Sequence, residues 1–235
     1  MKKLVSILLV SLIVITAFAS CGKIKDDGKA KPVSVTFTDG DFEYVILEDG
    51  TAKITGFHPE GNYEELNIPS SFINQSVIST TSEAESSSDE AETTALSDQI
   101  PVSVIGEEAF AGSQAIQYVN FCSTLVRIEK RAFAESSIKN AMMASSRKLT
   151  DIEEGAFADC PELIQIDIPA SVVNFGAGCF ANATKLVVVS FRGNQEKLDN
   201  SIFEGSNSFR VCTYKENPNI IKFAEDNNYE LKVLN

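Results

Sequence analysis

Phenylalanine recurs at a nearly constant interval along the second half of the chain. Phe110, Phe133, Phe157, Phe180 and Phe203 are separated by 23, 24, 23 and 23 residues. Similar text surrounds the first four, which read VIGEEAFAG, RIEKRAFAE, DIEEGAFAD and NFGAGCFAN. A fixed period of about 20 to 30 residues indicates stacked coils, because one such unit cannot bury its own apolar face. We therefore expect these phenylalanines to form a ladder in the core.

A second apolar pattern, apolar-x-x-apolar-x-apolar, follows each phenylalanine. Its members are Ile116/Val119/Phe121, Ile138/Ala141/Met143, Leu163/Ile166/Ile168, Leu186/Val189/Phe191 and Phe209/Cys212/Tyr214. Alternation at the end of each triplet predicts a short strand with one buried face. The sequence therefore predicts an α/β-type repeat solenoid made mostly of short strands and turns.

The repeated text also resembles a known family. The segments IGEEAFAG, IEEGAFADC-PELIQIDIPASV and NIPSS are similar to the BspA-type leucine-rich repeat family of bacterial surface proteins, over roughly residues 66–214. The resemblance implies a right-handed leucine-rich repeat coil displayed at the cell surface. It also implies protein or host-matrix binding, without naming a ligand.

The segments on either side of the repeats are expected to cap the stack, because open ends would expose apolar faces and strand edges. Residues 33–65 predict an N-terminal β cap, with a hairpin across the Asp49-Gly50 turn. The repeat solenoid is assigned to residues 66–215. Residues 216–235 predict a helix-strand cap, in which Asn217 caps a helix that has Pro218 in its first turn.

The start of the chain predicts export. Lys2 and Lys3 precede an apolar run that ends at Phe18, as in a secretory signal peptide over residues 1–20. The text FAS before Cys21 resembles a lipobox, which implies that Cys21 is lipidated and that residues 21–32 form a tether. The expected location is the outer face of a bacterial cytoplasmic membrane or the cell surface. A soluble secreted protein and an uncleaved membrane anchor are the alternatives.

Charge argues against nucleic acid as a partner. The whole chain has a net charge of −13. Loss of residues 1–20 would remove Lys2 and Lys3 and no acid, so the processed chain would carry −15. A strongly acidic chain repels a phosphate backbone.

A polar insertion interrupts the repeats at residues 76–99. Between residues 79 and 97 there are 10 Ser or Thr, five acids, no bases and no aromatic residues. Such a composition buries too little apolar surface to offset its ordering entropy, so we expect disorder. Glycosylation, cation attraction or a flexible partner arm are possible functions; the alternative is a tolerated insertion at an exposed coil edge.

The sequence contains no recognisable catalytic or metal-binding motif. The one histidine, His58, lies in a turn-like GFHPEGN. The acid pairs Glu107-Glu108 and Glu153-Glu154 occupy equivalent repeat positions, where we expect them to be solvated. No nucleophile elbow, zinc motif or phosphate loop is present. We therefore expect no enzyme activity, no metal and no cofactor.

Four cysteines follow Cys21, namely Cys122, Cys160, Cys179 and Cys212. They form neither a C-x-x-C pair nor a single column in the repeat, which argues against zinc. We expect buried free thiols. A disulfide between Cys160 and Cys179 in neighbouring coils is the alternative, because export permits disulfides.

The residues between the buried triplet positions should face outward and form one ribbon. This candidate binding face comprises Gln117, Tyr118, Asn120, Lys139, Asn140, Met142, Ile164, Gln165, Asp167, Val187, Val188 and Ser190. Five of these side chains are apolar or aromatic, which favours a contact surface. The alternative is that a flank, a neighbouring chain or the acidic insertion covers the ribbon.

Together these features predict a monomeric surface lipoprotein that binds a protein or another surface macromolecule through its repeats. A structural envelope lipoprotein without a specific ligand is the alternative from a second class. A hydrolase is the least favoured, because no acid, base and nucleophile converge in the sequence.

Overall fold

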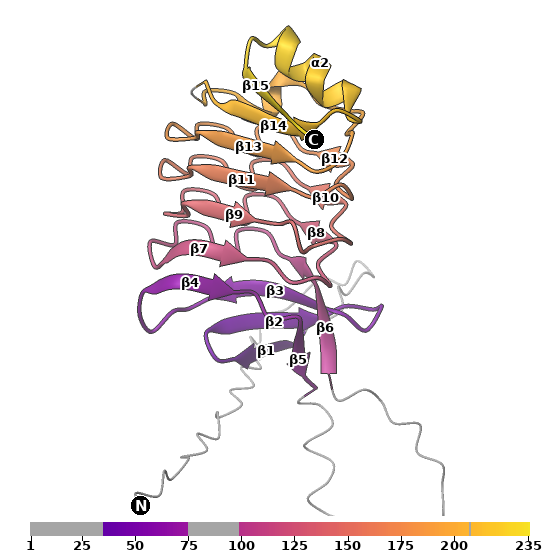
Figure 1. The fold of residues 1–235 in the computed structure, drawn as a ribbon. Coiled ribbons are helices and arrows are strands. Elements are labelled where there is room, and N and C mark those ends of the chain that lie inside the picture. Colours follow the sequence, from indigo (N-terminus) through magenta and orange to yellow (C-terminus); the bar gives the residue numbers. More distant parts are fainter. Residues whose placement is uncertain (1–34, 75–98, 207) are drawn as a thin grey trace, which may run out of the picture.

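The computed structural model describes residues 35–74, 99–206 and 208–235. In these residues the chain winds into stacked coils that build two sheets (Figure 1). One, which we call the front sheet, is parallel throughout and has the order β15 (Glu230–Leu234), β14 (Arg210–Tyr214), β13 (Val188–Phe191), β11 (Gln165–Ile168), β9 (Asn140–Met142), β7 (Ile116–Asn120) and β4 (Tyr63–Asn67).

The second sheet, which we call the back sheet, carries the other strand of each coil. Its order is β1 (Thr36–Asp39), β2 (Phe42–Ile46), β3 (Ala52–Phe57), β6 (Gln99–Ile105), β8 (Arg127–Ile128), β10 (Asp151–Ile152) and β12 (Asn174–Phe175), with β5 (Ser71–Ile73) beside β6. The turn that leads from a back-sheet strand to the next front-sheet strand carries the repeated phenylalanine. We call each such turn an arc.

The five repeated phenylalanines form the predicted ladder. Their rings are buried, and neighbouring centroids along the stack are 4.7, 5.0, 5.3 and 5.5 Å apart. The interplanar angles are 10°, 3°, 18° and 15°, so the rings stack in parallel. The predicted repeat solenoid is confirmed, with a single α-helix among the described residues.

The first four arcs have a residue with positive φ on both sides of the phenylalanine, and the fifth has one only after it. The residues with positive φ two positions before it are Glu108, Arg131, Gly155 and Gly178, and those two positions after it are Gly112, Glu135, Asp159, Asn182 and Gly205. Left-handed backbone favours Gly and is tolerated best by Asn and Asp among the other residues. This preference explains why Gly, Asn and Asp occupy six of the nine positions, whereas Glu108, Arg131 and Glu135 adopt the same conformation without being favoured residue types.

The predicted N-terminal hairpin is present. Strands β2 and β3 are antiparallel, and Leu47 N–H donates to the Thr51 carbonyl (2.8 Å) across the turn. The hairpin also joins the stack, because β3 pairs in parallel with β6. Phe57 lies at the end of β3. Its ring centroid is 5.1 Å from that of Phe110, so it continues the row of aromatic rings into the cap. Strand β1, which precedes this hairpin, was not predicted.

The C-terminal cap contains helix α2 (Pro218–Asp226) and β15, as predicted. Asn217 occupies the N-cap position, as predicted, but its side chain makes no capping hydrogen bond. Its amide donates instead to the Thr213 hydroxyl (2.9 Å), while Asn194 Oδ1 accepts from Asn219 N–H (2.8 Å) at the start of the helix. An acceptor from the preceding coil thus serves the helix, which a local sequence pattern does not reveal.

The apolar triplets of the first four coils are buried as predicted. In the fifth triplet Phe209 is buried as predicted. Its two strand positions are wrong by one residue, because strand pairing aligns Val211 with Val189 and Cys212 with Ser190. Val211 and Thr213 are buried, whereas Cys212 is partly exposed. A shift of one residue reverses which side chains of a strand face the core.

Several sequence predictions lie outside the described residues. They include the signal peptide, the lipidated Cys21, the tether and the predicted disorder of the insertion. The described chain does show where that insertion leaves and rejoins the fold, because β5 and β6 are antiparallel with Ile73 paired to Gln99. Among the residues with described structure, no helix is both long and apolar enough to cross a membrane.

The ladder makes a prediction about stability. Phe157 is fully buried between two stacked neighbours, so Phe157→Ala should lower the free energy of unfolding by about 3–5 kcal/mol. Phe175→Ala, at a partly buried phenylalanine outside the ladder, should cost clearly less. Urea unfolding followed by circular dichroism measures both; equal losses would contradict a special role of the stack.

Candidate functional site

The structure places the candidate binding face on the outer side of the front sheet. Strand pairing aligns Tyr118, Asn140, Gln165 and Val188 in one column across β7, β9, β11 and β13. A second column contains Asn120, Met142, Asp167 and Ser190. The third, at the strand entrances, contains Gln117, Lys139, Ile164 and Val187, joined by backbone hydrogen bonds of 2.7–2.9 Å.

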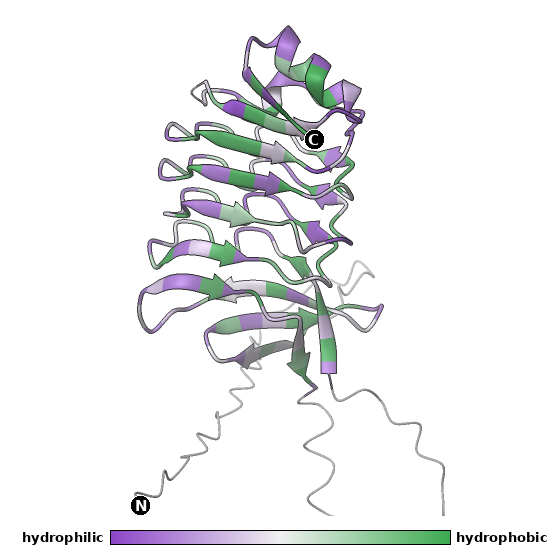
Figure 2. Ribbon diagram, viewed as in Figure 1, coloured by the Kyte–Doolittle hydropathy of each residue, from purple (hydrophilic) through white to green (hydrophobic). Residues whose placement is uncertain are grey.

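Exposed aliphatic side chains gather at the entrances of β11 and β13. Ile164 is 39% exposed and Val187 is 55% exposed, and Val187 N–H donates to the Ile164 carbonyl (2.9 Å), so the two residues are neighbours. Val188 follows on β13 and is partly buried. Figure 2 shows the hydrophobic colour at the start of β13. The described chain leaves this patch accessible to a partner.

The N-terminal end of the same face is polar. Asn120 donates to Asn67 Oδ1 (2.9 Å) and to Glu65 on β4. Lys139 Nζ donates to Gln117 Oε1 (2.7 Å) in the entrance column. The face therefore has an amide-rich half over β4, β7 and β9, which also carries Tyr118 and the 37% exposed Met142, and a more aliphatic half over β11 and β13. Such a mixture of polar and apolar groups suits one amphipathic macromolecular partner.

Asp167 does not belong to the accessible surface. Although it occupies an outward column, it is only 2% exposed, because Arg192 covers it with hydrogen bonds of 2.7 and 2.6 Å to its two carboxylate oxygens. The hydrogen bond to Asp167 raises the pKa of the Arg192 guanidinium. Arg192 also donates to the Tyr214 hydroxyl (3.2 Å). The candidate face therefore presents Arg192 where the sequence suggested a carboxylate.

Sequence reasoning missed the continuation of the face toward the C-terminus. Strand β14 aligns Arg210 with Val188, and β15 aligns Glu230 with Arg210. Arg210 Nε donates to Glu230 Oε1 (2.8 Å). Equivalent residues of β13 and β14 are one residue closer in the sequence than those of β11 and β13. An alignment of the fifth triplet on Phe209 therefore did not place Arg210 on the outer face.

The remaining polar groups form structural contacts between coils. Glu108 pairs with Arg131 (3.3 Å), and Glu154 pairs with Lys130 (2.9 Å). Glu107, Glu108 and Glu154 are solvent-exposed, as predicted, and Glu153 is partly exposed. The ion pairs of Glu108 and Glu154 add contacts with a neighbouring coil. His58 is exposed and lies 3.0 Å from Glu43.

The cysteines of the described chain are free thiols. Cys122, Cys160 and Cys179 are buried, as predicted, and Cys212 is not fully buried. Burial raises the pKa of the Cys160 and Cys179 thiols, so neither is a ready nucleophile. Within residues 35–74, 99–206 and 208–235, no three His, Cys, Asp or Glu side chains are placed to hold a metal ion.

Comparison with known proteins assigns the family. The family model of the BspA type leucine rich repeat region matches residues 86–210, more than half of the chain, in six copies. The chain therefore belongs to the BspA-type leucine-rich repeat family, whose repeat is a module of protein interaction. No curated protein matches the chain.

Solved structures share the fold. The pneumococcal vaccine antigen PcpA superposes with a TM-score of 0.55 at 16% identity, covering 79% of this chain and 51% of PcpA. A leucine-rich repeat protein from Bacteroides capillosus gives a TM-score of 0.44 at 23% identity, covering 75% of this chain and 97% of its own. The first of these likenesses supports the repeat fold alone.

The covered carboxylate leads to a second prediction. Arg192→Ala should remove both hydrogen bonds to the Asp167 carboxylate and the cation that covers it, and lower the free energy of unfolding by about 1–3 kcal/mol, a range reduced because Arg192 itself is 43% exposed. Arg210→Ala, which opens an exposed pair, should have little effect.

The double variant Arg192→Ala with Asp167→Asn should recover part of the loss, since a neutral amide is less costly to bury than an unpaired carboxylate. Urea unfolding of the four proteins measures this. Equal effects of Arg192→Ala and Arg210→Ala would contradict a buried role for Asp167.

Proposed function

We propose that this protein is an exported lipoprotein, anchored through Cys21, whose leucine-rich repeats bind another macromolecule at the bacterial cell surface. The front sheet supplies the binding face, and the partner is a protein of the host matrix or of a bacterial surface. The membership in the BspA-type family supports an interaction module.

The observation that carries the proposal is the accessible aliphatic patch on the front sheet. Ile164 and Val187 are neighbours, exposed by 39% and 55%, beside a polar half of the same ribbon. A solvated face without a partner has no need for two adjacent branched aliphatic side chains at these positions. Burial of both would contribute about 25 cal/mol per Å² of apolar surface removed from water.

A capture experiment tests the face. The purified protein should bind saturably to an extracellular-matrix preparation or to a bacterial surface fraction, and the double variant Ile164→Ser/Val187→Ser should bind at least about tenfold more weakly, as expected for centrally placed apolar contacts. Surface plasmon resonance measures the affinity, and thermal unfolding verifies that the fold is retained.

Val173→Ser is the matched control, because Val173 is 54% exposed but precedes β12 on the back sheet. It should retain full binding. Equal loss in both variants would reject the front sheet as the binding face. Absence of saturable capture by the parent protein would favour the structural envelope role.

The anchor gives a separate prediction. Expressed in a bacterial host, the parent chain should incorporate a fatty-acid label and sediment with membranes, whereas Cys21→Ser should incorporate none, because the thiol that would carry the lipid is absent. Labelling and fractionation of both chains measure this. Labelling of the Cys21→Ser chain would exclude the proposed attachment residue.

A further inference from the structure

The arcs are joined by a main-chain ladder that repeats from coil to coil. The N–H group of each of the first four ladder phenylalanines donates to a carbonyl of the next arc, as in Phe110 to the Ala132 carbonyl (2.8 Å) and Phe133 to the Ala156 carbonyl (2.7 Å). The residues two positions before and after it donate in the same way, for example Gly112 to Ala134 (2.7 Å). Each interior arc therefore offers three carbonyls to the arc before it.

The first arc offers these carbonyls without receiving donors. Glu107, Ala109 and Ala111 are equivalent to Lys130, Ala132 and Ala134, yet no N–H group of the described chain donates to their carbonyls. Ala109 is only 6% exposed. A buried carbonyl without a partner costs free energy, so the Ala109 carbonyl favours an incoming donor. Glu107 and Ala111 are exposed, and their carbonyls are accessible to the same donor strand.

The cap leaves this gap for a local reason. The cap and the first coil are hydrogen-bonded before and after this gap. Gly106 N–H donates to the Ile54 carbonyl (2.7 Å), and Tyr63 N–H donates to the Ala115 carbonyl (2.6 Å). Between these points His58 N–H turns away to the Asp41 carbonyl (2.8 Å), and Pro59 has no N–H group. The cap therefore cannot act as the missing arc.

A side chain of the first arc lacks its partner for the same reason. At the position three residues after the phenylalanine, Cys160 donates to the Phe133 carbonyl (3.1 Å) and Ser206 donates to the Phe180 carbonyl (2.9 Å). Ser113 occupies this position in the first arc, and its hydroxyl is buried without a hydrogen-bond partner in the described structure. A carbonyl from a preceding arc would satisfy it.

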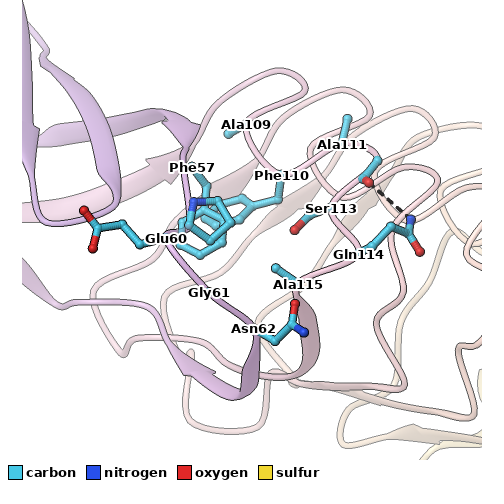
Figure 3. A pocket seen from close by; sticks show the side chains of 12 residues that line it. Phe57, Glu60, Gly61, Asn62, Ala109, Phe110, Ala111, Ser113, Gln114 and Ala115 are labelled. Atoms are coloured by element: carbon cyan, nitrogen blue, oxygen red, sulfur yellow. Dashed lines mark hydrogen bonds between the residues drawn. The ribbon is translucent and has the colours of Figure 1, made fainter.

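Ala109, Ala111 and Ser113 line a groove of about 450 Å³ between the cap and the first arc. Figure 3 shows Phe57 and Phe110 side by side within it, with Ser113 and Ala115 on the side of the first arc. The two rings are 5.1 Å apart, so Phe57 already fills the core position that a new arc would need. The one charged residue among those lining the groove is Glu60.

We propose that this groove binds an extended peptide segment of a partner protein, which continues the inter-coil ladder by donating alternate N–H groups to the Glu107, Ala109 and Ala111 carbonyls. Its central carbonyl accepts from the Ser113 hydroxyl. Because Phe57 occupies the core position, the inward side chain of the segment is small, as in Ala or Gly. Lys or Arg on either side of this small residue is favoured by the negative charge of Glu60, by the carbonyl oxygens and by the net charge of −13 of the chain.

The test uses the full chain and a labelled peptide, acetyl-KRAAAGK-amide, followed by fluorescence anisotropy. The peptide should bind saturably. N-methyl groups on its Arg, central Ala and Gly, which remove the three donors, should weaken binding at least about tenfold, whereas N-methyl groups on its first and third Ala should change it less than about threefold.

Two variants of the protein localise the contact. Ser113→Ala should weaken peptide binding about fivefold without lowering the melting temperature, because the hydroxyl has no partner in the free protein. Gly61→Trp should block binding with the fold retained, since a side chain at Gly61 would meet no atom within 4 Å at its Cβ. Val173→Trp, at an exposed residue near β12, should leave binding unchanged.

Each other result overturns the proposal. Equal loss from both N-methylated peptides would show that the main-chain donors are not used. Binding that survives Gly61→Trp would place the peptide elsewhere. Concentration-dependent self-association, detected by analytical ultracentrifugation and abolished by Gly61→Trp, would assign the groove to a second copy of this chain in place of a partner peptide.

Discussion

Contact between successive coils is the interaction on which the whole structure depends. Each coil is too short to enclose a core, so its apolar residues are buried only by the coils before and after it. The stacked phenylalanines supply the centre of that contact, at ring distances of 4.7–5.5 Å, and the arc ladder fixes the spacing between the coils. The contacts between coils that stabilise the fold therefore also set the spacing of the residues on its surface.

Stacking also explains why the surface is divided into columns. Parallel pairing sets equivalent residues of neighbouring coils beside each other, so a partner meets rows of side chains from β7, β9, β11 and β13. The columns need not share one chemistry. Here an amide-rich half passes into an aliphatic half, while Arg192 closes over Asp167 and removes that carboxylate from the surface.

The two ends of the stack are closed by different means. At the C-terminal end helix α2 packs Phe223 against Phe203 (6.4 Å), and Tyr229 stacks on Phe209 (4.3 Å). At the N-terminal end the hairpin covers the core through Phe57, but no N–H group of the described residues pairs with the Glu107, Ala109 and Ala111 carbonyls. The described N-terminal closure therefore satisfies the apolar contacts but not all of the main-chain hydrogen bonds, and the groove lies at this gap.

The sequence by itself determined the period, the buried phenylalanines, the hairpin at Asp49-Gly50 and the helix-strand ending, because each follows from local patterns that repeat or from strong turn and helix signals. Only the tertiary structure decided the burial of Asp167, the outward position of Cys212, the acceptor Asn194 that serves the start of helix α2, and the carbonyls of the first arc that have no N–H partner among the described residues. These features depend on strand register and on contacts between residues more than 20 positions apart, such as Arg192 with Asp167. A one-residue change in spacing reverses a strand's faces, and no local pattern records which distant group covers a side chain.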